Sequence, residues 1–341
     1  MNNIYNYNLQ DLEELCINLG YKKFNAGQIF DWLYKKRINK FSEMSNVKKE
    51  LIKYLEENYY LGTIKVIKKQ KDNMVAKFLF ELNDTQKVEA VYMNHDYGNS
   101  LCVSSQVGCN MGCAFCESGR LKKVRNLEAA EMVEQILIIE KELNLRITHL
   151  VLMGIGEPFD NYDNVIKFID IINENKGIGL GARHITISTC GVIPKIKEFT
   201  KYDKQVNLAI SLHAPNNEIR NKIMPINKAY KVEELISALN DYIKETNRRV
   251  TFEYIMLKDI NDQEETAIML AKLLKGMNCY VNLIPYNETS HIDFKKSSKN
   301  QIMKFYDTLK QNKINVTIRK EFGSNVDAAC GQLRSTYEEG K

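Results

Sequence analysis

The sequence predicts an α/β protein whose main domain is a partial (β/α)6 barrel. Three features of the 341-residue chain predict it: helical spacing of apolar residues before about residue 60, alternating polar and apolar runs between 63 and 93, and apolar strands that alternate with amphipathic helices from about residue 98. Strands that alternate with helices are typical of parallel βαβ units. We therefore expect an N-terminal helical accessory module, a small antiparallel sheet and then the barrel.

The helical module is expected over residues 1–62. Leu9, Leu12 and Cys16 lie at helical spacing, and similar groups recur around residue 30 and between residues 51 and 55. The antiparallel extension, 63–97, should follow, with strands at 63–69, 74–82 and 87–93.

The barrel is expected over residues 98–320, and residues 321–341 should form a C-terminal loop or tail. The predicted strands are 147–153, 184–188, 207–212, 249–255, 280–284 and 315–318, and the predicted helices are 165–173, 193–199, 232–244, 264–274 and 301–309. The active site of such a barrel lies at the carboxyl ends of its strands.

Composition limits the classes of protein and partner. No apolar run approaches the roughly 20 residues that a membrane-spanning helix needs, and the first residues lack a basic region followed by an apolar one. We therefore expect a cytoplasmic protein that does not bind membranes. The net charge of +5 permits a phosphate-rich partner without requiring one. The eight cysteines of such a protein indicate metal ligation or catalysis rather than structural disulfides.

Three cysteines form the most informative motif. Cys109, Cys113 and Cys116 have the spacing C-x3-C-x2-C, and thiolates so close together can hold an iron–sulfur cluster or zinc. Structural zinc normally has four ligands in paired short spacings, and the chain has no second C-x2-C. Three thiolates on a four-iron cluster leave one iron open to a small molecule, so we favour a [4Fe–4S] cluster over zinc or coincidence.

This motif, with Phe115 before its third cysteine, resembles the signature of the radical S-adenosylmethionine superfamily. The resemblance implies a radical-SAM barrel in which the open iron binds S-adenosylmethionine and one electron releases a 5′-deoxyadenosyl radical. Glycine and polar residues that end successive predicted strands should form the cofactor pocket, although an isolated histidine such as His213 is more often a hydrogen-bonded core residue. The expected pocket residues are Gly156, Glu157, Ser188, Ser211, Leu212, His213 and Asn287.

Ordered motifs along most of the chain resemble the RlmN/Cfr group of radical methyltransferases. They begin at Gln28-Ile-Phe-Asp-Trp-Leu-Tyr-Lys-Lys-Arg37 and end at Asp327-Ala-Ala-Cys-Gly-Gln-Leu-Arg334. The resemblance implies methylation of adenosine 2503 of 23S rRNA, at C2 by RlmN, which also acts on adenosine 37 of tRNA, and at C8 by Cfr, which confers antibiotic resistance. Motifs such as Cys-Gly-Gln-Leu-Arg favour RlmN, whereas Phe322-Gly323 is closer to Cfr.

The same resemblance assigns three catalytic residues. Cys330 takes a methyl group from one S-adenosylmethionine and becomes S-methylcysteine. A second S-adenosylmethionine supplies the radical that activates this methyl group, so that two are used per turnover. The activated methylene adds to the adenine carbon and links RNA to protein. Glu89 then removes the ring proton, and Cys102 attacks the Cys330 sulfur, forming a transient disulfide as the methylated RNA leaves.

The resemblance also implies partners. We expect naked or pre-assembly 23S rRNA and tRNA as substrates, a flavodoxin-like electron donor, and a monomeric enzyme. Lys35, Lys36 and Arg37, beside Trp32 and Tyr34, are expected RNA contacts, although Trp32 suits the core equally. Two other classes stay open: a zinc-containing RNA-binding protein without catalysis, and a radical enzyme that acts on a small molecule or peptide.

Overall fold

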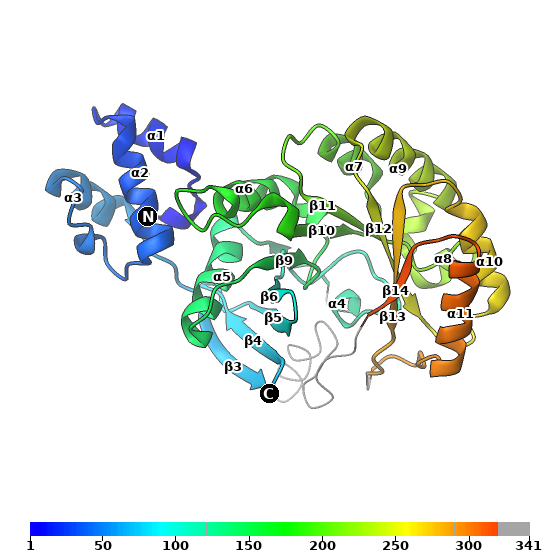
Figure 1. The fold of residues 1–341 in the computed structure, drawn as a ribbon. Coiled ribbons are helices and arrows are strands. Elements are labelled where there is room, and N and C mark those ends of the chain that lie inside the picture. Colours follow the sequence, from blue (N-terminus) through cyan, green and yellow to red (C-terminus); the bar gives the residue numbers. More distant parts are fainter. Residues whose placement is uncertain (121, 290, 320–341) are drawn as a thin grey trace.

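The structure, a computed structural model, describes residues 1–120, 122–289 and 291–319. Its centre is one open sheet with the strand order β14-β13-β12-β11-β10-β9-β6-β5-β4-β3 (Figure 1). Neighbouring strands from β6 to β14 are parallel, and those from β3 to β6 are antiparallel. These strands are β3 (Lys65–Lys71), β4 (Val75–Glu81), β5 (Lys87–His95), β6 (Gly98–Cys102), β9 (His149–Leu152), β10 (Ile185–Thr189), β11 (Asn207–Ser211), β12 (Val250–Met256), β13 (Cys279–Pro285) and β14 (Val316–Ile318).

The parallel part confirms the predicted partial barrel, and its strands from β9 to β14 lie within a few residues of the predicted ranges. Helices fill the connections, and Figure 1 shows α7, α9, α10 and α11 on the outer side of the curved sheet. Because helices cover that side, the parallel strands are buried and apolar, as in other α/β proteins. These helices are α4 (Glu117–Arg120), α5 (Ala129–Leu143), α6 (Tyr162–Asn173), α7 (Ile193–Phe199), α8 (Asn217–Ile223), α9 (Val232–Thr246), α10 (Glu264–Leu273) and α11 (Lys299–Gln311).

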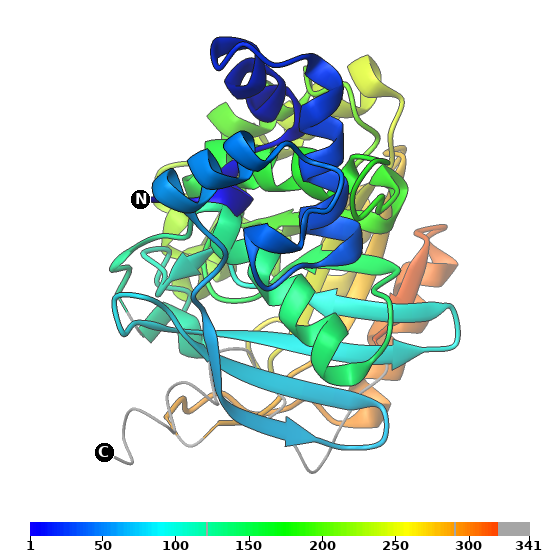
Figure 2. The same ribbon diagram turned by 90° about the vertical axis from the view of Figure 1, so that its left-hand side faces the viewer.

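The antiparallel strands continue the barrel sheet and do not form a sheet of their own. Strand β6 joins the two parts, because Cys102 is paired with Val91 of β5 on one side and with Val151 of β9 on the other. Figure 2 shows this antiparallel extension running across the lower part of the molecule. One continuous sheet therefore places side chains of β4 and β5 beside the ends of the barrel strands. A separate two-stranded pair, β7 (Gln106–Val107) and β8 (Arg125–Asn126), flanks the cysteine motif.

The N-terminal module packs against α5 and α6 of the barrel (Figure 2). Buried Glu134 of α5 accepts hydrogen bonds from Asn3 Nδ2 at 2.7 Å and from the backbone N–H groups of Thr63 and Ile64 at 2.7 and 3.0 Å. This carboxylate thus joins both ends of the module to the barrel. The module consists of α1 (Leu9–Asn18), α2 (Lys23–Asp31), α3 (Lys49–Asn58) and the short parallel strands β1 (Asn2–Asn3) and β2 (Tyr59–Tyr60).

None of the helices in the described ranges is long and apolar enough to cross a lipid bilayer.

Candidate active site

A cavity of about 370 Å³ lies at the carboxyl ends of the parallel strands. It unites the predicted site residues that the structure describes, with the exception of Leu212, whose side chain lies in the core. Cys330 lies outside the described residues. The predicted residues that line the cavity are Glu89, Cys102, Cys109, Cys113, Cys116, Gly156, Glu157, Ser188, Ser211, His213 and Asn287.

The cysteine motif is held in tight consecutive turns. The Cys116 N–H donates to the Cys113 carbonyl at 3.1 Å, and the Gly119 N–H donates to the Cys116 carbonyl at 3.0 Å. A side chain at position 119 would bring its Cβ within 2.9 Å of the Cys113 carbonyl oxygen, so this close turn requires glycine. Between the cysteines, the Ala114 N–H donates to the Ile223 carbonyl of α8 at 2.9 Å and fixes the loop to the barrel.

The donor set of this loop suits an iron–sulfur cluster. Three soft thiol ligands line one cavity, and burial raises the pKa of Cys109 to about 12, although the Met111 N–H opposes this shift. Such thiols lose their protons when they bind a metal. Among the described residues, no three His, Cys, Asp or Glu side chains converge closely enough to hold a single ion. A four-iron cluster takes one thiolate on each of three irons, so its ligands stand further apart than those of one zinc ion.

The glycine turn after β9 packs directly against Gln106, the first residue of β7. Gly156 has φ of +112°, and a Cβ there would lie 2.6 Å from Gln106 Cβ. This turn presents Glu157, whose buried carboxylate accepts hydrogen bonds from the Phe159 N–H at 3.0 Å and the Cys190 N–H at 2.8 Å. Burial raises the pKa of Glu157, and these hydrogen bonds oppose the shift. Within the described part of the chain no basic side chain forms an ion pair with Glu157, which leaves it suited to an ammonium ligand.

His213 faces the cavity from the end of β11 in a neutral state. Its Nδ1 accepts a hydrogen bond from the Ile255 N–H at 3.0 Å, which requires that nitrogen to be unprotonated. Burial, together with the charge of Arg220, lowers the pKa of His213 to about 3. The ring packs edge-on against Phe115 of the cysteine motif, with centroids 4.9 Å apart. His213 is therefore both a hydrogen-bonded buried histidine and a cavity residue.

The antiparallel extension contributes a buried ion pair to the same cavity. Lys77 Nζ of β4 lies 3.1 Å from Glu89 Oε2 of β5, and the two side chains are 1% and 2% exposed. Cys102 lies nearby at the end of β6. Burial raises the pKa of this thiol to about 11, while the charges of Arg319 and Lys77 oppose the shift.

The cavity is also lined by residues that were not predicted as site residues, among them Lys77, Thr189, Cys190 and Glu253. Lys77 and Glu253 could have been noticed, because each is a charged residue with buried apolar neighbours on both sides in its strand. Cys190 is buried and also lines the cavity. Its approach to Glu157 depends on the folded position of two separate strand ends, which no local pattern reveals.

The expected RNA contacts of the N-terminal module need correction at two positions. Tyr34 is 1% exposed and belongs to the core, and Arg37 pairs with buried Glu140 of α5. Trp32 is partly buried, and Lys36 Nζ lies 3.5 Å from the centroid of its ring. Lys35 and Lys36 are exposed, and Lys36 Nζ also lies 3.5 Å from Asp31 Oδ2.

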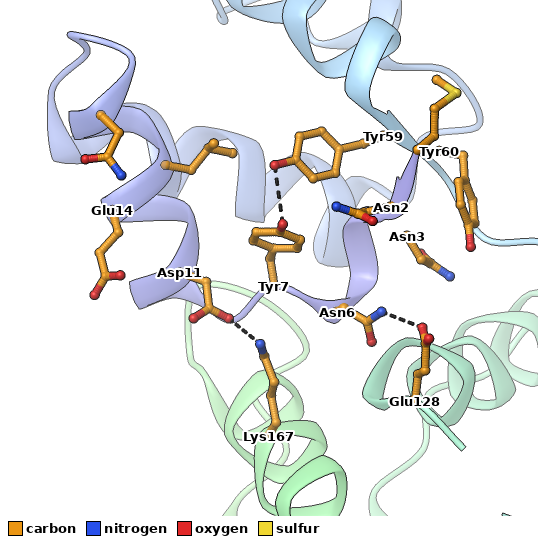
Figure 3. Close-up of a pocket in the computed structure, with 13 residues that line it drawn as sticks. Asn2, Asn3, Asn6, Tyr7, Asp11, Glu14, Tyr59, Tyr60, Glu128 and Lys167 are labelled. Carbon is orange, nitrogen blue, oxygen red and sulfur yellow. Dashed lines mark hydrogen bonds and ion pairs between the residues drawn. The ribbon is translucent and has the colours of Figure 1, made fainter. Parts of the chain in front are cut away.

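A second cavity, of about 560 Å³, lies where the N-terminal module meets the barrel. Figure 3 shows its polar lining, in which Asp11 pairs with Lys167 at 2.8 Å and Asn6 donates to Glu128 at 2.6 Å. With Lys167 paired, Glu14 and Glu128 leave a negative surface that is unsuited to RNA phosphates. None of the predicted site residues lines it.

Comparisons with known proteins agree with these features. Residues 103–271 match the Radical SAM superfamily, and residues 2–61 match the Ribosomal RNA large subunit methyltransferase N-terminal domain. The chain is 56% identical to the "Probable dual-specificity RNA methyltransferase RlmN" of Acholeplasma laidlawii, over 97% of this chain and 98% of that protein. It is 54% identical to the protein of the same name from Spiroplasma citri, over 99% of both. The crystal structure of a radical SAM methyltransferase from Sphaerobacter thermophilus superposes with a TM-score of 0.92 at 38% identity, covering 97% of this chain and 99% of that one.

Proposed function

Since the chain belongs to the RlmN family of radical S-adenosylmethionine RNA methyltransferases, we propose that it methylates C2 of adenosine 2503 in 23S rRNA and of adenosine 37 in tRNA. The observation that carries the proposal is the single cavity that the cysteine motif shares with Glu89 and Cys102. A buried carboxylate and a buried thiol beside a radical-generating centre fit a reaction that must remove a ring proton and then break a covalent link to protein.

The chain's residues divide the work of binding the cofactors. Cys109, Cys113 and Cys116 hold the [4Fe–4S] cluster, which, together with S-adenosylmethionine, supplies the electron, the methyl group and the radical. Glu157 receives the methionine ammonium group. Gly156 lets the backbone approach the ligand closely, and Ser188, Ser211, His213 and Asn287 bind other polar groups of the cofactor around the cavity.

Three residues act on the substrate. Cys330 carries the methyl group as S-methylcysteine, which uses one S-adenosylmethionine, while a second is used for its activation. Its position in the sequence supports this role: Arg319 lines the cavity, and an extended chain reaches up to about 35 Å over the eleven positions that follow. Once the methylene is bonded to the adenine carbon, the adduct radical loses one electron, for which the cluster would be the acceptor, and Glu89 takes up the ring proton. The Cys102 thiolate then bonds to the Cys330 sulfur. As this disulfide forms, the sulfur–methylene bond breaks, and the carbon keeps the bonding pair and takes up a proton to become the methyl group of the released product.

The proposed partners follow from this chemistry. The adenine must leave its stack to reach a cavity at the strand ends, which favours naked or pre-assembly 23S rRNA and tRNA over an assembled ribosome. The exposed Lys35 and Lys36 lie on the N-terminal module and could contact RNA phosphates. A flavodoxin-like protein would supply the electrons, a cytosolic thiol reductant would reopen the disulfide, and the enzyme would act as a monomer.

The test is to express the gene in a host that lacks its own enzyme and to identify methyladenosines in digested 23S rRNA and tRNA by mass spectrometry. 2-Methyladenosine in both RNAs is the expected product. 8-Methyladenosine would instead make the protein a Cfr-type enzyme. If neither 2-methyladenosine nor 8-methyladenosine is formed, the proposal is overturned. The control is Cys330→Ala, which should form no methylated RNA while keeping its cluster absorbance. A radical enzyme acting on a small molecule would keep its activity in that variant.

A further inference from the structure

Arg220 of α8 carries a buried positive charge that no carboxylate among residues 1–120, 122–289 and 291–319 pairs with. The residue is 0% exposed, and every hydrogen bond of its guanidinium reaches a neutral oxygen. These bonds join Nε to Leu212 O at 3.1 Å, Nη1 to Asn227 Oδ1 at 3.1 Å and Tyr230 O at 3.5 Å, and Nη2 to Cys190 O at 2.7 Å and Ser211 O at 3.3 Å. Among the described residues no Asp or Glu forms an ion pair with it. A buried charge without a counter-ion is strongly unfavourable, which indicates that an anion belongs nearby.

The position of Arg220 shows where this anion would lie. One turn further along α8, the Ile223 carbonyl accepts the Ala114 N–H, which stands next to Cys113 in the cysteine motif. On its other side, Arg220 binds the carbonyl of Cys190, and Cys190 lines the active-site cavity together with Cys113.

We propose that Arg220 is a positioning residue whose charge balances the [4Fe–4S] cluster and raises its reduction potential. A cluster held by three thiolates is negative, and it becomes more negative when it takes up an electron. A fixed cation close by therefore stabilises the reduced state more than the oxidised state. The inference rests on the proposed assignment of the cluster to Cys109, Cys113 and Cys116.

A purely structural role is the competing explanation. The guanidinium joins carbonyls at the ends of β10 and β11 to that of Tyr230, which follows α8 in the chain, and this network would help to hold the strand ends even without a cluster. The two roles differ in one measurable respect, because the network depends on hydrogen bonds and the potential depends on charge.

The experiment measures the reduction potential of the reconstituted holoenzyme by redox titration, followed by electron paramagnetic resonance. Arg220→Met and Arg220→Gln both remove the charge, and the glutamine variant keeps some of the hydrogen bonds. Arg220→Lys keeps the charge. We expect a shift to more negative potential in both neutral variants and a potential close to that of the wild type in the lysine variant. The control is Arg146→Met: Arg146 also binds a carbonyl, that of Ile178, but precedes β9 at the opposite end of the strands and should leave the potential unchanged.

Each outcome is decisive. A wild-type potential in cluster-loaded Arg220→Met or Arg220→Gln overturns the inference. If neither neutral variant retains iron, the lysine variant decides. Wild-type iron content and reduction potential in Arg220→Lys support the proposed role of the charge. Loss of the cluster in Arg220→Lys as well leaves only a structural role for Arg220 and overturns the inference. A wild-type protein that assembles no cluster, or a Cys113→Ala variant that keeps a complete one, would instead overturn the assignment of the cluster to the three cysteines.

Discussion

The buried pair of Lys77 and Glu89 gives the sharpest prediction about stability. Replacing Lys77 by Met keeps most of the side chain's volume and removes its charge. The carboxylate of Glu89, 2% exposed, then loses an ammonium group that stood 3.1 Å away. We expect Lys77→Met to lower the free energy of unfolding by about 3–5 kcal/mol, the usual cost of breaking a buried ion pair from one side.

The magnitude follows from the geometry. At 3.1 Å and an effective dielectric constant of about 20, the attraction between two unit charges is about 5 kcal/mol. Water cannot replace it, because both side chains are almost completely enclosed. Removing both charges at once avoids leaving the buried Glu89 charge without the Lys77 ammonium group, so Lys77→Met/Glu89→Gln should lose at least about 2 kcal/mol less than the sum of its single variants.

The assay is equilibrium unfolding in urea of the two single variants and the double variant. Lys222→Met is the matched control, since Lys222 lies at the same distance of 3.1 Å from Glu218 but the two side chains are 63% and 78% exposed. That variant should lose less than about 1 kcal/mol. Additive losses in the Lys77 and Glu89 cycle, or a loss in Lys77→Met no larger than in the control, would refute the view that burial makes this pair strong.

Other predictions concern the cavity. Gly156→Ala places a Cβ 2.6 Å from Gln106 Cβ at a φ of +112°, so it should abolish S-adenosylmethionine binding in equilibrium dialysis. The control is Gly20→Ala, also at positive φ but with nothing within 4 Å of the added Cβ, which should leave binding intact. Wild-type affinity in Gly156→Ala would contradict the proposed pocket. The pKa of His213 is lowered to about 3 in the folded protein. As the pH falls, the His213 ring is therefore protonated in the unfolded chain at a higher pH than in the folded protein. Its contribution to stability, at most about 5 kcal/mol, is complete above about pH 6.5 and is lost as the pH falls toward 3. Unfolding titrations should show this slope reduced in His213→Gln, and an unchanged slope would disprove the assignment. Cys102→Ala should accumulate RNA covalently bound to protein, visible as a ribonuclease-sensitive band on denaturing gels. If this band is absent although the variant contains an active cluster, Cys102 has no role in product release.

The elements that the sequence predicted well are those with a strong local period. The barrel strands and the helices α7, α9 and α10 match because one buried face repeats along each of them. Helix α5 was not predicted, because it is buried almost all round and its buried face includes Glu131, Glu134 and Glu140. Such carboxylates look like a solvent face until their partners are known, and Glu134 and Glu140 have partners in the distant N-terminal module.

The antiparallel strands were predicted one by one, but their joining to the barrel was not. Strand β6 begins with Gly98-Asn99-Ser100, which has little apolar pattern, and it is defined by hydrogen bonds to β5 and β9 on its two edges. Because β6 bridges the two parts, residues of the extension line one side of the cavity at the strand ends.

The sequence alone determined the local chemistry: the cysteine spacing, the glycine turn before Glu157 and the polar residues at strand ends are fixed by a few neighbouring positions. Only the tertiary structure decided which distant groups share the cavity. Lys77 reaches Glu89 across two paired strands, Cys190 reaches Glu157 across two strand ends, and the charge of Arg220 comes to lie behind the cysteine loop. The physical reason is that spacing along a chain fixes neighbours within a turn or a strand. The pairing order of the sheet and the burial of charge in its interior arise only when the whole chain has packed.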